Sequence, residues 1–402
     1  MHVQRERSGA EAQIAQLLRT ARRRLGLSVA FLSRIDASTR TMQVVDSLLA
    51  TITDGYSGPR DSGFCLAVLE GRLPRVMPDV RDVPEAMALH PADLPQIRAH
   101  ISVPVVLSDG TVYGTFCAFG LVPDPEVTHR DLAVMEVLAD AAAMVIEPQI
   151  RTEQQHAEIR DRLRPVMDAG GPEVLLQPIV DLCDGTRIGA EALSRFPAAW
   201  HRTPDVVFDE AHRIGAGHRL ELLALARGAG LLDRVPGYVS LNVSPQTLLT
   251  PQCGELLETL PLDRIVLELS EHDQVHDYPA VEAALSPLRR RGMRLAIDDV
   301  GAGFSSLRHI VMACPDVIKM DRSIVSGVDH DPMLARLAQS LVEFAHSFDV
   351  SLVAEGVETA AEHAVLQSLG VDGGQGWLFG RPTPVDALVE AGTVPAPEPL
   401  TA

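Results

Sequence analysis

Two adjacent carboxylates at the end of an apolar run are the first chemical signal in this sequence. Asp298 and Asp299 follow the run Leu295–Ile297 and lead into a glycine-rich segment, 300–306. A Gly-x-Gly segment behind a strand can hold a phosphate with its backbone N–H groups, but neighbouring carboxylates would repel that phosphate. A pair of aspartates instead suits a metal ion. The rest of the chain must decide between these two interpretations.

Polar residues also end the other apolar runs in the second half of the chain. They are Gln177, Glu191, Asn242, Glu268 with Glu271, Asp298 with Asp299, Lys319 with Asp321, Glu355 with Glu358, and Gln375. A single acidic residue at a strand end is usually a helix N-cap or a solvated group. In a closed parallel barrel, however, the carboxyl ends of all strands meet on one face. The repetition therefore favours a functional site.

The types of these residues indicate which ion the site would bind. Carboxylate and amide oxygens, without a convergent group of His or Cys, suit Mg²⁺ or Mn²⁺ rather than a structural zinc. Asp298 can bridge two ions while Asp299 binds only the second, and two-metal sites of this kind catalyse phosphoryl displacement. Lys319 would lie in the acidic ring, where it can hold a water or a phosphate oxygen and where the carboxylates favour its charged form.

The elements that would position these residues alternate between strand and helix. Eight strand-like runs between 174 and 379 are mostly separated by helical patterns. Such a series, over about 230 residues, predicts an α/β fold with a (β/α)8 TIM-like barrel. A doubly wound open sheet is the alternative.

The first part of the chain predicts a smaller α+β domain with an antiparallel sheet. Residues 10–25 have the apolar spacing of an amphipathic helix, and strand-like runs follow them. Residues 101–120 read as two strands joined by a Ser-Asp-Gly turn, which is typical of a hairpin. The helical pattern 130–146 closes the domain.

The 402 residues are too many for one ordinary core, so at least two domains are expected. We divide the chain into a first domain, 1–147, a helical linker, 148–165, a barrel domain, 166–392, and a disordered Pro-rich tail, 393–402. The linker is polar with few apolar positions. A helix packed in a homodimer and a solvated linker in a monomer both fit this composition, and we carry the homodimer forward as the prediction.

Composition excludes several classes of protein. A net charge of −19 argues against sequence-independent nucleic-acid binding, which basic residues drive. No apolar run approaches the roughly 18 residues that cross a bilayer, and the first residues do not form a signal peptide, so we expect no membrane contact and a cytoplasmic location. Scattered single cysteines suggest buried thiols in a reducing compartment. They are Cys65, Cys117, Cys183, Cys253 and Cys314.

Ordered motifs between about 165 and 390 resemble the EAL domain, a family that hydrolyses the bacterial second messenger cyclic di-GMP to linear pGpG. The matching segments are QPIVDL (177–182), EALSR (191–195), LNVSP (241–245), LELSE (267–271), IDDVGAGFSSL (297–307), IKMDRSIV (318–325), AEGVET (354–359) and GGQGWLFGRP (373–382). These motifs cover nearly the whole second half of the chain. No Gly-Gly-Asp/Glu-Glu-Phe signature occurs, which argues against a cyclic di-GMP synthase in the same chain.

The resemblance implies a role for each matched residue. The first divalent ion, Mg²⁺ or Mn²⁺, would be held by Glu191, Asn242, Glu268 and Asp298. The second would be held by Asp298, Asp299 and Glu355. Lys319 and Glu355 would activate the attacking water, and Glu191 would join them as a catalytic residue. The substrate would be contacted by Gln177, Leu193, Arg195 and Gln375. Asp321 and Glu358 would support the site from behind the ligands, and Glu271 would anchor the loop after Asp299.

The chain departs from the family pattern at one position beside the aspartate pair. The family has Phe between the second aspartate and the glycine, whereas this chain has Val300. Ala302 and Phe304, in place of Thr and Tyr, are milder changes. The substitution implies an enzyme whose activity is weaker or depends more on regulation. A catalytically silent cyclic di-GMP receptor is the alternative function, and a metal-dependent lyase or aldolase on a similar barrel is a third.

Residues 10–147 resemble a GAF domain, a family of sensors and dimerisation modules. The resemblance rests on the strand-like runs near 28–36 and 101–120, the segment 71–80 and the closing helix. It implies regulation of the barrel domain by a small ligand or signal that the sequence does not specify. Cys65 and Cys117 are interpreted as buried apolar residues, with a redox or chromophore site as the alternative. His90 and His100 are poor candidates for haem ligands.

Overall fold

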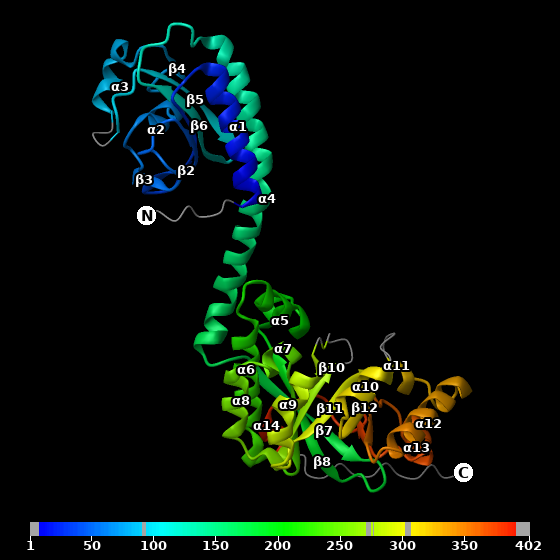
Figure 1. Ribbon diagram of the computed structural model, residues 1–402. Coiled ribbons are helices and arrows are strands. Elements are labelled where there is room, and N and C mark those ends of the chain that lie inside the picture. Colours follow the sequence, from blue (N-terminus) through cyan, green and yellow to red (C-terminus); the bar gives the residue numbers. More distant parts are fainter. Residues whose placement is uncertain (1–7, 91–93, 271–274, 276, 302–306, 391–402) are drawn as a thin grey trace. The chain divides into compact units, whose positions relative to one another are not determined.

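The computed structural model describes residues 8–90, 94–270, 275, 277–301 and 307–390 (Figure 1). The chain divides into two compact units, Met1–Gln155 and His156–Ala402, which we describe one at a time. Helix α4 (His129–Asp168) begins in the first unit and ends in the second, and it includes the predicted linker 148–165. The domain limits drawn from the sequence stay predictions, and the tail 393–402 lies outside the described residues.

The amino-terminal unit is built on a six-stranded sheet in the order β3-β2-β1-β6-β5-β4, in which neighbours pair antiparallel. The strands are β1 (Val29–Ile35), β2 (Thr39–Ser47), β3 (Tyr56–Pro59), β4 (Val76–Met77), β5 (Ala99–Val106) and β6 (Val112–Gly120). The helices are α1 (Gly9–Leu25), α2 (Phe64–Leu69), α3 (Pro84–Ala88) and the first part of α4. The predicted hairpin is confirmed as β5 and β6, joined by a turn in which Gly110 has φ +84°.

Alternating side chains give this sheet two apolar faces. Ala30 and Leu32 belong to a core shared with α1 and α4, whereas Val29 and Phe31 belong to a second core shared with α2. This is the two-residue period of an extended strand, which sends successive side chains to opposite faces. The unit is therefore an α+β domain with an antiparallel sheet, as the sequence predicts, and the structure adds that helices cover both faces of the sheet.

The carboxy-terminal unit is a closed eight-stranded barrel in the order β10-β11-β12-β13-β14-β7-β8-β9. Its strands are β7 (Glu173–Asp181), β8 (Arg187–Arg195), β9 (Tyr238–Asn242), β10 (Ile265–Ser270), β11 (Arg294–Val300), β12 (Val317–Met320), β13 (Ser351–Ala354) and β14 (Gly373–Gln375). Closure confirms the predicted barrel over the doubly wound sheet. One strand differs from a fully parallel (β/α)8 barrel, because β7 runs antiparallel to both β8 and β14.

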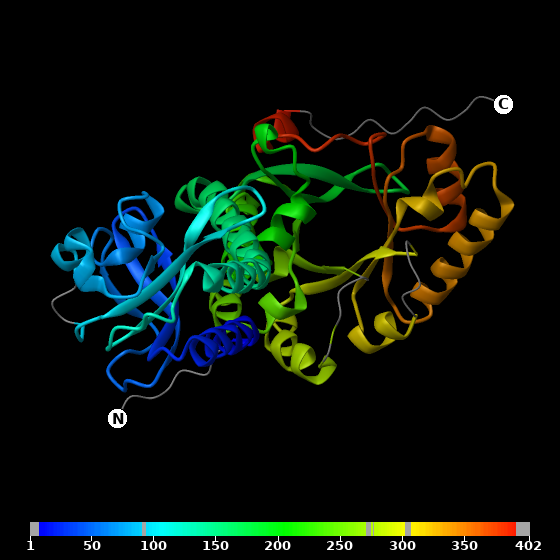
Figure 2. The same cartoon turned by 90° about the horizontal axis from the view of Figure 1, so that it is seen from above.

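Helices surround this barrel (Figure 2). They are α5 (Pro204–Arg213), α6 (Gly217–Ala229), α7 (Pro245–Leu248), α8 (Pro251–Glu258), α9 (Tyr278–Arg289), α10 (Leu307–Ala313), α11 (Arg322–Val325), α12 (Pro332–His346), α13 (Ala360–Leu369) and α14 (Val385–Glu390). Their starts follow capping rules: α13, for example, begins with a capping box made by Thr359 and Glu362. Among the described helices, none is long and apolar enough to span a membrane.

Candidate active site

The strand period places the predicted site residues inside the barrel. Val266, Ala296, Val317 and Val353 belong to a small apolar cluster separate from the large core between strands and helices. Two positions further along each strand, side chains return to the same face. The residues at those positions are Glu268, Asp298, Lys319 and Glu355. An apolar layer therefore lies beneath a layer of charged groups.

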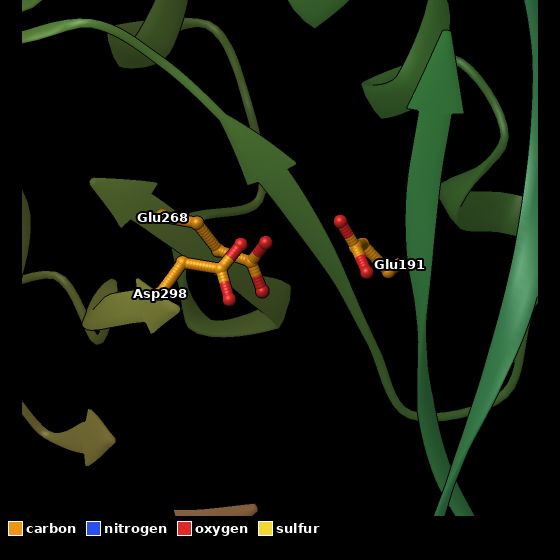
Figure 3. A group of neighbouring side chains, drawn as sticks. All are labelled: Glu191, Glu268 and Asp298. Carbon is orange, nitrogen blue, oxygen red and sulfur yellow. The ribbon is translucent and has the colours of Figure 1, made fainter. Parts of the chain in front are cut away.

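Carboxylates from neighbouring strands converge in that charged layer. Glu191 of β8, Glu268 of β10 and Asp298 of β11 each offer an oxygen, and these oxygens all lie within 4.8 Å of one another (Figure 3). A second group of the same kind consists of Asp298, Asp299 and Glu355. Asp298 belongs to both groups, so the structure brings together all five carboxylates predicted to bind metal.

A bulge in β11 explains how two adjacent aspartates serve one site. In a regular strand Asp298 and Asp299 would point to opposite faces. The register between β11 and β12 shifts between Ile297 and Val300, and Asp299 has φ +60°. A non-glycine residue in this left-handed region costs on the order of 1–3 kcal/mol. This local strain accompanies the placement of both carboxylates beside Glu355.

Lys319 occupies the centre of the carboxylates. Its Nζ lies 2.6 Å from Glu355 Oε1, 3.0 Å from Glu268, 3.1 Å from Asp298 and 3.4 Å from Glu191. The residue is 1% exposed, and it is the only lysine in the 402-residue chain. One ammonium group faces four carboxyl groups, so it can balance only one of them when they are ionised.

Burial and this charge imbalance shift the pKa values of the group. Burial raises the pKa of Glu355 to about 8 and that of Glu268 well above its usual range, although Lys319 lowers both. Burial also opposes the charge of Glu191, but Lys319, Gln375 and Asn242 together hold its pKa below the usual range. For Lys319, burial is outweighed by the surrounding carboxylates, which raise its pKa well above the model-peptide value.

The raised pKa of Lys319 can be measured directly by NMR. Because the sequence contains a single lysine, protein labelled with ¹⁵N at lysine Nζ should give one side-chain signal. In the metal-free protein we expect the pKa of this ammonium to lie above that of the urea-unfolded chain, which serves as the reference at about 10.4. Its contribution to stability is then fully present below the unfolded pKa and is lost as pH rises through the folded pKa. A folded-state midpoint at or below the unfolded value contradicts this prediction.

Three amide side chains complete the polar layer. Asn242 donates to Glu191 at 2.9 Å, and Gln375 donates to Glu191 at 2.7 Å and to Gln177 at 3.1 Å. Gln375 is 4% exposed, and its Oε1 has no partner among the described residues. The glycines beside it have a packing reason, because a Cβ on Gly376 would overlap the backbone of Val357. Gln177 reaches the site from the middle of antiparallel β7, opposite Glu191, rather than from a strand end.

A cavity of about 680 Å³ opens beside the acidic layer and includes Asn242 and Glu268 in its wall. Leu193 and Arg195, predicted from the EALSR segment, also line it. Sequence reasoning missed the opposite wall, which contains Phe208 and His212 of α5. The signal for this wall was positional, because α5 follows the carboxyl end of β8.

The remaining predicted residues lie around α11 or outside the described part. The Asp321 carboxylate accepts a hydrogen bond from the Ser323 N–H and caps α11. Glu358 forms an ion pair with Arg322 at 2.8 Å. Within the described residues, the ion pairs of Lys319 involve neither of these two carboxylates. Glu271 falls outside the described residues, so its predicted role stays a prediction.

The donor set fits hard divalent cations. It contains carboxylate oxygens, with the amide of Asn242 beside Glu191, and holds more acidic groups than Lys319 can balance. The unpartnered Oε1 of Gln375, a predicted substrate contact, lies beside this set. Within the described residues, both candidate groups are made only of Asp and Glu, so soft transition-metal ligands are missing from them. Oxygen-rich sites of this kind prefer Mg²⁺ or Mn²⁺ to zinc.

Comparisons with known proteins agree with the fold and the site. Residues 160–382 match the family model of the EAL domain, and residues 11–147 match that of the GAF domain. Because the EAL match covers more than half of the chain, the chain belongs to the EAL domain family. Both resemblances inferred from the sequence are thereby confirmed.

Individual relatives share part of their length with this chain. An uncharacterised protein of Azorhizobium caulinodans is 31% identical over 295 residues, covering 68% of this chain and 39% of the relative. The probable cyclic di-GMP phosphodiesterase PdeB of Escherichia coli is 28% identical over 260 residues, covering 61% of this chain and 48% of the relative. The chain thus spans less than half the length of these two relatives.

A solved structure supports the barrel assignment. The PaMucR phosphodiesterase in complex with c-di-GMP is 26% identical to this chain and superimposes with a TM-score of 0.51. The match covers 57% of this chain and 99% of the other. An EAL domain is therefore similar in both sequence and fold to the carboxy-terminal unit.

Proposed function

We propose that this protein is a metal-dependent phosphodiesterase that hydrolyses cyclic di-GMP to linear pGpG, regulated by its GAF domain. The observation that carries the proposal is the buried acidic layer, with Lys319 at its centre, beside a cavity of about 680 Å³. Relatives named as cyclic di-GMP phosphodiesterases support it. All five predicted metal carboxylates and the lysine are present, which favours an enzyme over a silent receptor.

The cavity suits a nucleotide in size and chemistry. Small-molecule sites usually enclose about 300–1,000 Å³ and combine apolar walls with a few polar groups. Leu193 and Phe208 supply apolar wall, and Arg195 supplies a guanidinium group. A guanidinium matches the planar arrangement of phosphate oxygens and binds them with charge-assisted hydrogen bonds. In our proposal Arg195, Gln177 and Gln375 orient the substrate, with Leu193 against a base.

Residues of the acidic layer would hold two divalent ions. Glu191, Asn242, Glu268 and Asp298 would bind the first, and Asp298, Asp299 and Glu355 the second. When bound, the ions would supply Lewis acidity and offset negative charge on the phosphodiester. Mg²⁺ and Mn²⁺ both suit these oxygen donors.

In our proposal, Lys319 and Glu355 bind and activate the attacking water. Their charged atoms lie 2.6 Å apart, so one water can contact both the ammonium and the carboxylate. The carboxylate accepts a proton as the water oxygen adds to phosphorus, and the bond from phosphorus to the 3′ oxygen breaks. Glu191 holds the amides of Asn242 and Gln375 in place.

The first test is direct product analysis. Purified full-length protein is incubated with cyclic di-GMP and either Mg²⁺ or Mn²⁺, and the nucleotides are separated by chromatography. We expect pGpG to accumulate and EDTA to stop its formation. Tight binding of cyclic di-GMP without any turnover under both ions would sink the enzyme proposal and favour the receptor.

Regulation by the GAF domain is tested separately. Removing residues 1–147 should change the rate of cyclic di-GMP hydrolysis if that domain controls the barrel. Sedimentation of both proteins tests the proposed homodimer and allows rates to be compared in matched oligomeric states. An unchanged rate under matched conditions argues against coupling.

A further inference from the structure

A second cavity lies inside the amino-terminal unit, between α2 and the sheet face that packs against it. Its volume is about 20 Å³. An enclosed space of roughly 10–15 Å³ on this measure holds one water, so the cavity suits a molecule of one or two heavy atoms. Apart from apolar side chains, it is lined by Arg40, Cys65 and His100.

Two of these side chains carry nitrogens without partners. Arg40 and His100 are each 2% exposed, and among the described residues Arg40 Nε, Arg40 Nη2 and His100 Nδ1 make no hydrogen bond. Buried polar groups in native proteins are nearly always paired, so each exception calls for an explanation. Burial lowers the pKa of His100 to about 3, which leaves its imidazole neutral. A small polar guest in the cavity would satisfy these nitrogens.

A pair of thiols stands at one wall of the same cavity. Cys65 of α2 lines the cavity, and its Sγ lies 3.9 Å from the Sγ of Cys117 on β6. Cys117 is not among the lining residues, so it stands behind Cys65 as seen from the cavity. Both thiols are buried. Cys117 also contacts Ser102 Oγ and Thr115 Oγ1, each at 3.0 Å. The sequence predicts that Cys65 and Cys117 are both buried, but it does not predict that the two thiols contact each other.

The two thiols differ in acidity. The hydrogen bond from Cys117, followed by the positive charge of Arg40, lowers the pKa of Cys65 to about 6 despite its burial. Burial and the neighbouring Cys65 raise the pKa of Cys117 well above its usual range. Of the two, Cys65 therefore loses its proton more readily than Cys117. A thiolate is the reactive form of cysteine toward oxidants.

We propose that this cavity is a reaction site for a small peroxide, at which Cys65 is oxidised and Cys117 then closes a disulfide with it. Hydrogen peroxide has two heavy atoms, so its size matches the volume of the cavity. Its oxygens would accept hydrogen bonds from the unpartnered N–H groups of Arg40. Bulkier hydroperoxides do not fit. The proposal concerns the amino-terminal unit alone and does not depend on the activity of the barrel.

The chemistry balances in two steps. The Cys65 thiolate attacks one peroxide oxygen, an S–O bond forms, the O–O bond breaks, and hydroxide leaves beside Arg40. In the second step, the hydroxide takes the proton of Cys117 and becomes the first water. The Cys117 sulfur then attacks the Cys65 sulfur, so that the S–S bond forms and the S–O bond breaks. The hydroxide that leaves from Cys65 gains a proton from solvent and becomes the second water. Overall, two thiols lose two electrons, and one peroxide with the two thiol protons becomes two waters.

The test compares cysteines within the reduced, full-length protein. Hydrogen peroxide is added at pH 7, samples are denatured and alkylated at intervals, and peptides are analysed by mass spectrometry without reduction. We expect a Cys65–Cys117 cross-linked peptide to form roughly tenfold faster than oxidation of the exposed Cys183 and Cys314, because only Cys65 lines the cavity beside Arg40. With cumene hydroperoxide, which is too large for the cavity, Cys65 and Cys117 should no longer react faster than Cys183 and Cys314.

Variants separate the two sulfurs. In Cys117→Ser, Cys65 should stop at sulfenic acid, which dimedone captures. In Arg40→Gln, oxidation of Cys65 should slow and require a higher pH, while Cys183 keeps its wild-type rate as the internal control. The proposal is wrong if Cys65 and Cys117 in the wild type stay reduced while Cys183 and Cys314 react. It is equally wrong if nitrite or formate raises the melting temperature while peroxide leaves Cys65 reduced, because the cavity is then an anion site.

Discussion

Replacing Lys319 with methionine is expected to lower the turnover of cyclic di-GMP by about 10²–10³-fold, the usual loss when one preorganised group that stabilises developing charge is removed. Methionine keeps the length of the apolar stem but removes the ammonium that lies 2.6 Å from Glu355. A water that contacts both groups would lose one of its two contacts. Product formation from saturating substrate with Mg²⁺ measures the effect. A variant that keeps the wild-type rate would remove Lys319 from the mechanism.

The same change should also destabilise the metal-free protein. The four carboxylates around Lys319 would be left buried without a cation, and breaking a buried ion pair costs about 3–5 kcal/mol. Divalent ions should restore much of this loss, because they supply the missing positive charge. Arg234→Met is the matched control, because it removes only the exposed ion pair with Asp386. Its effect on stability should stay within about 1 kcal/mol, as is usual for surface pairs.

The comparison of sequence and structure shows why the barrel was predictable and one strand direction was not. Apolar runs that alternate with helical patterns indicate the strands of a barrel. The residue pattern of such a run does not indicate whether the strand lies parallel or antiparallel to its neighbours. The signal for β7 lay in its connection. Only the five residues 182–186 separate β7 from β8, and a parallel crossover needs a dozen or more. A hairpin, and hence an antiparallel β7, follows from that length.

The site residues that lie on strands could be predicted from the sequence, whereas those that lie on helices could not. Glu268 and Lys319 occupy fixed positions on neighbouring strands, so the period of two residues predicts that they face the same interior. The bulge that turns Asp299 toward Glu355 depends on backbone geometry that no residue type requires. Phe208 and His212 come from α5, whose contact with the cavity is set by packing in three dimensions. The pairing of Cys65 with Cys117 is likewise a tertiary contact.

Replacing Asp298 with asparagine should abolish turnover for a different reason. Among the residues that the structure describes, Asp298 alone belongs to both groups of candidate metal ligands. An amide keeps the shape of the side chain but removes its charge, so both ions should bind more weakly. We expect turnover to fall by about 10³-fold, which corresponds to roughly 4 kcal/mol of lost charge stabilisation. Calorimetric titration with Mn²⁺ should show weaker binding at both sites.

Asp299→Asn is the matched control, because Asp299 belongs to only one of the two groups. It should weaken one Mn²⁺ site and leave the other unchanged. Equal loss at both sites in this control would contradict the assignment of separate ions to the two groups. Stability separates loss of metal binding from loss of fold: Asp298→Asn removes one of the four acidic groups around Lys319, so the metal-free protein should be no less stable. Lys319→Met has the opposite effect because it removes the ammonium at their centre, and the two variants together test whether the surplus of acidic groups creates the demand for divalent ions.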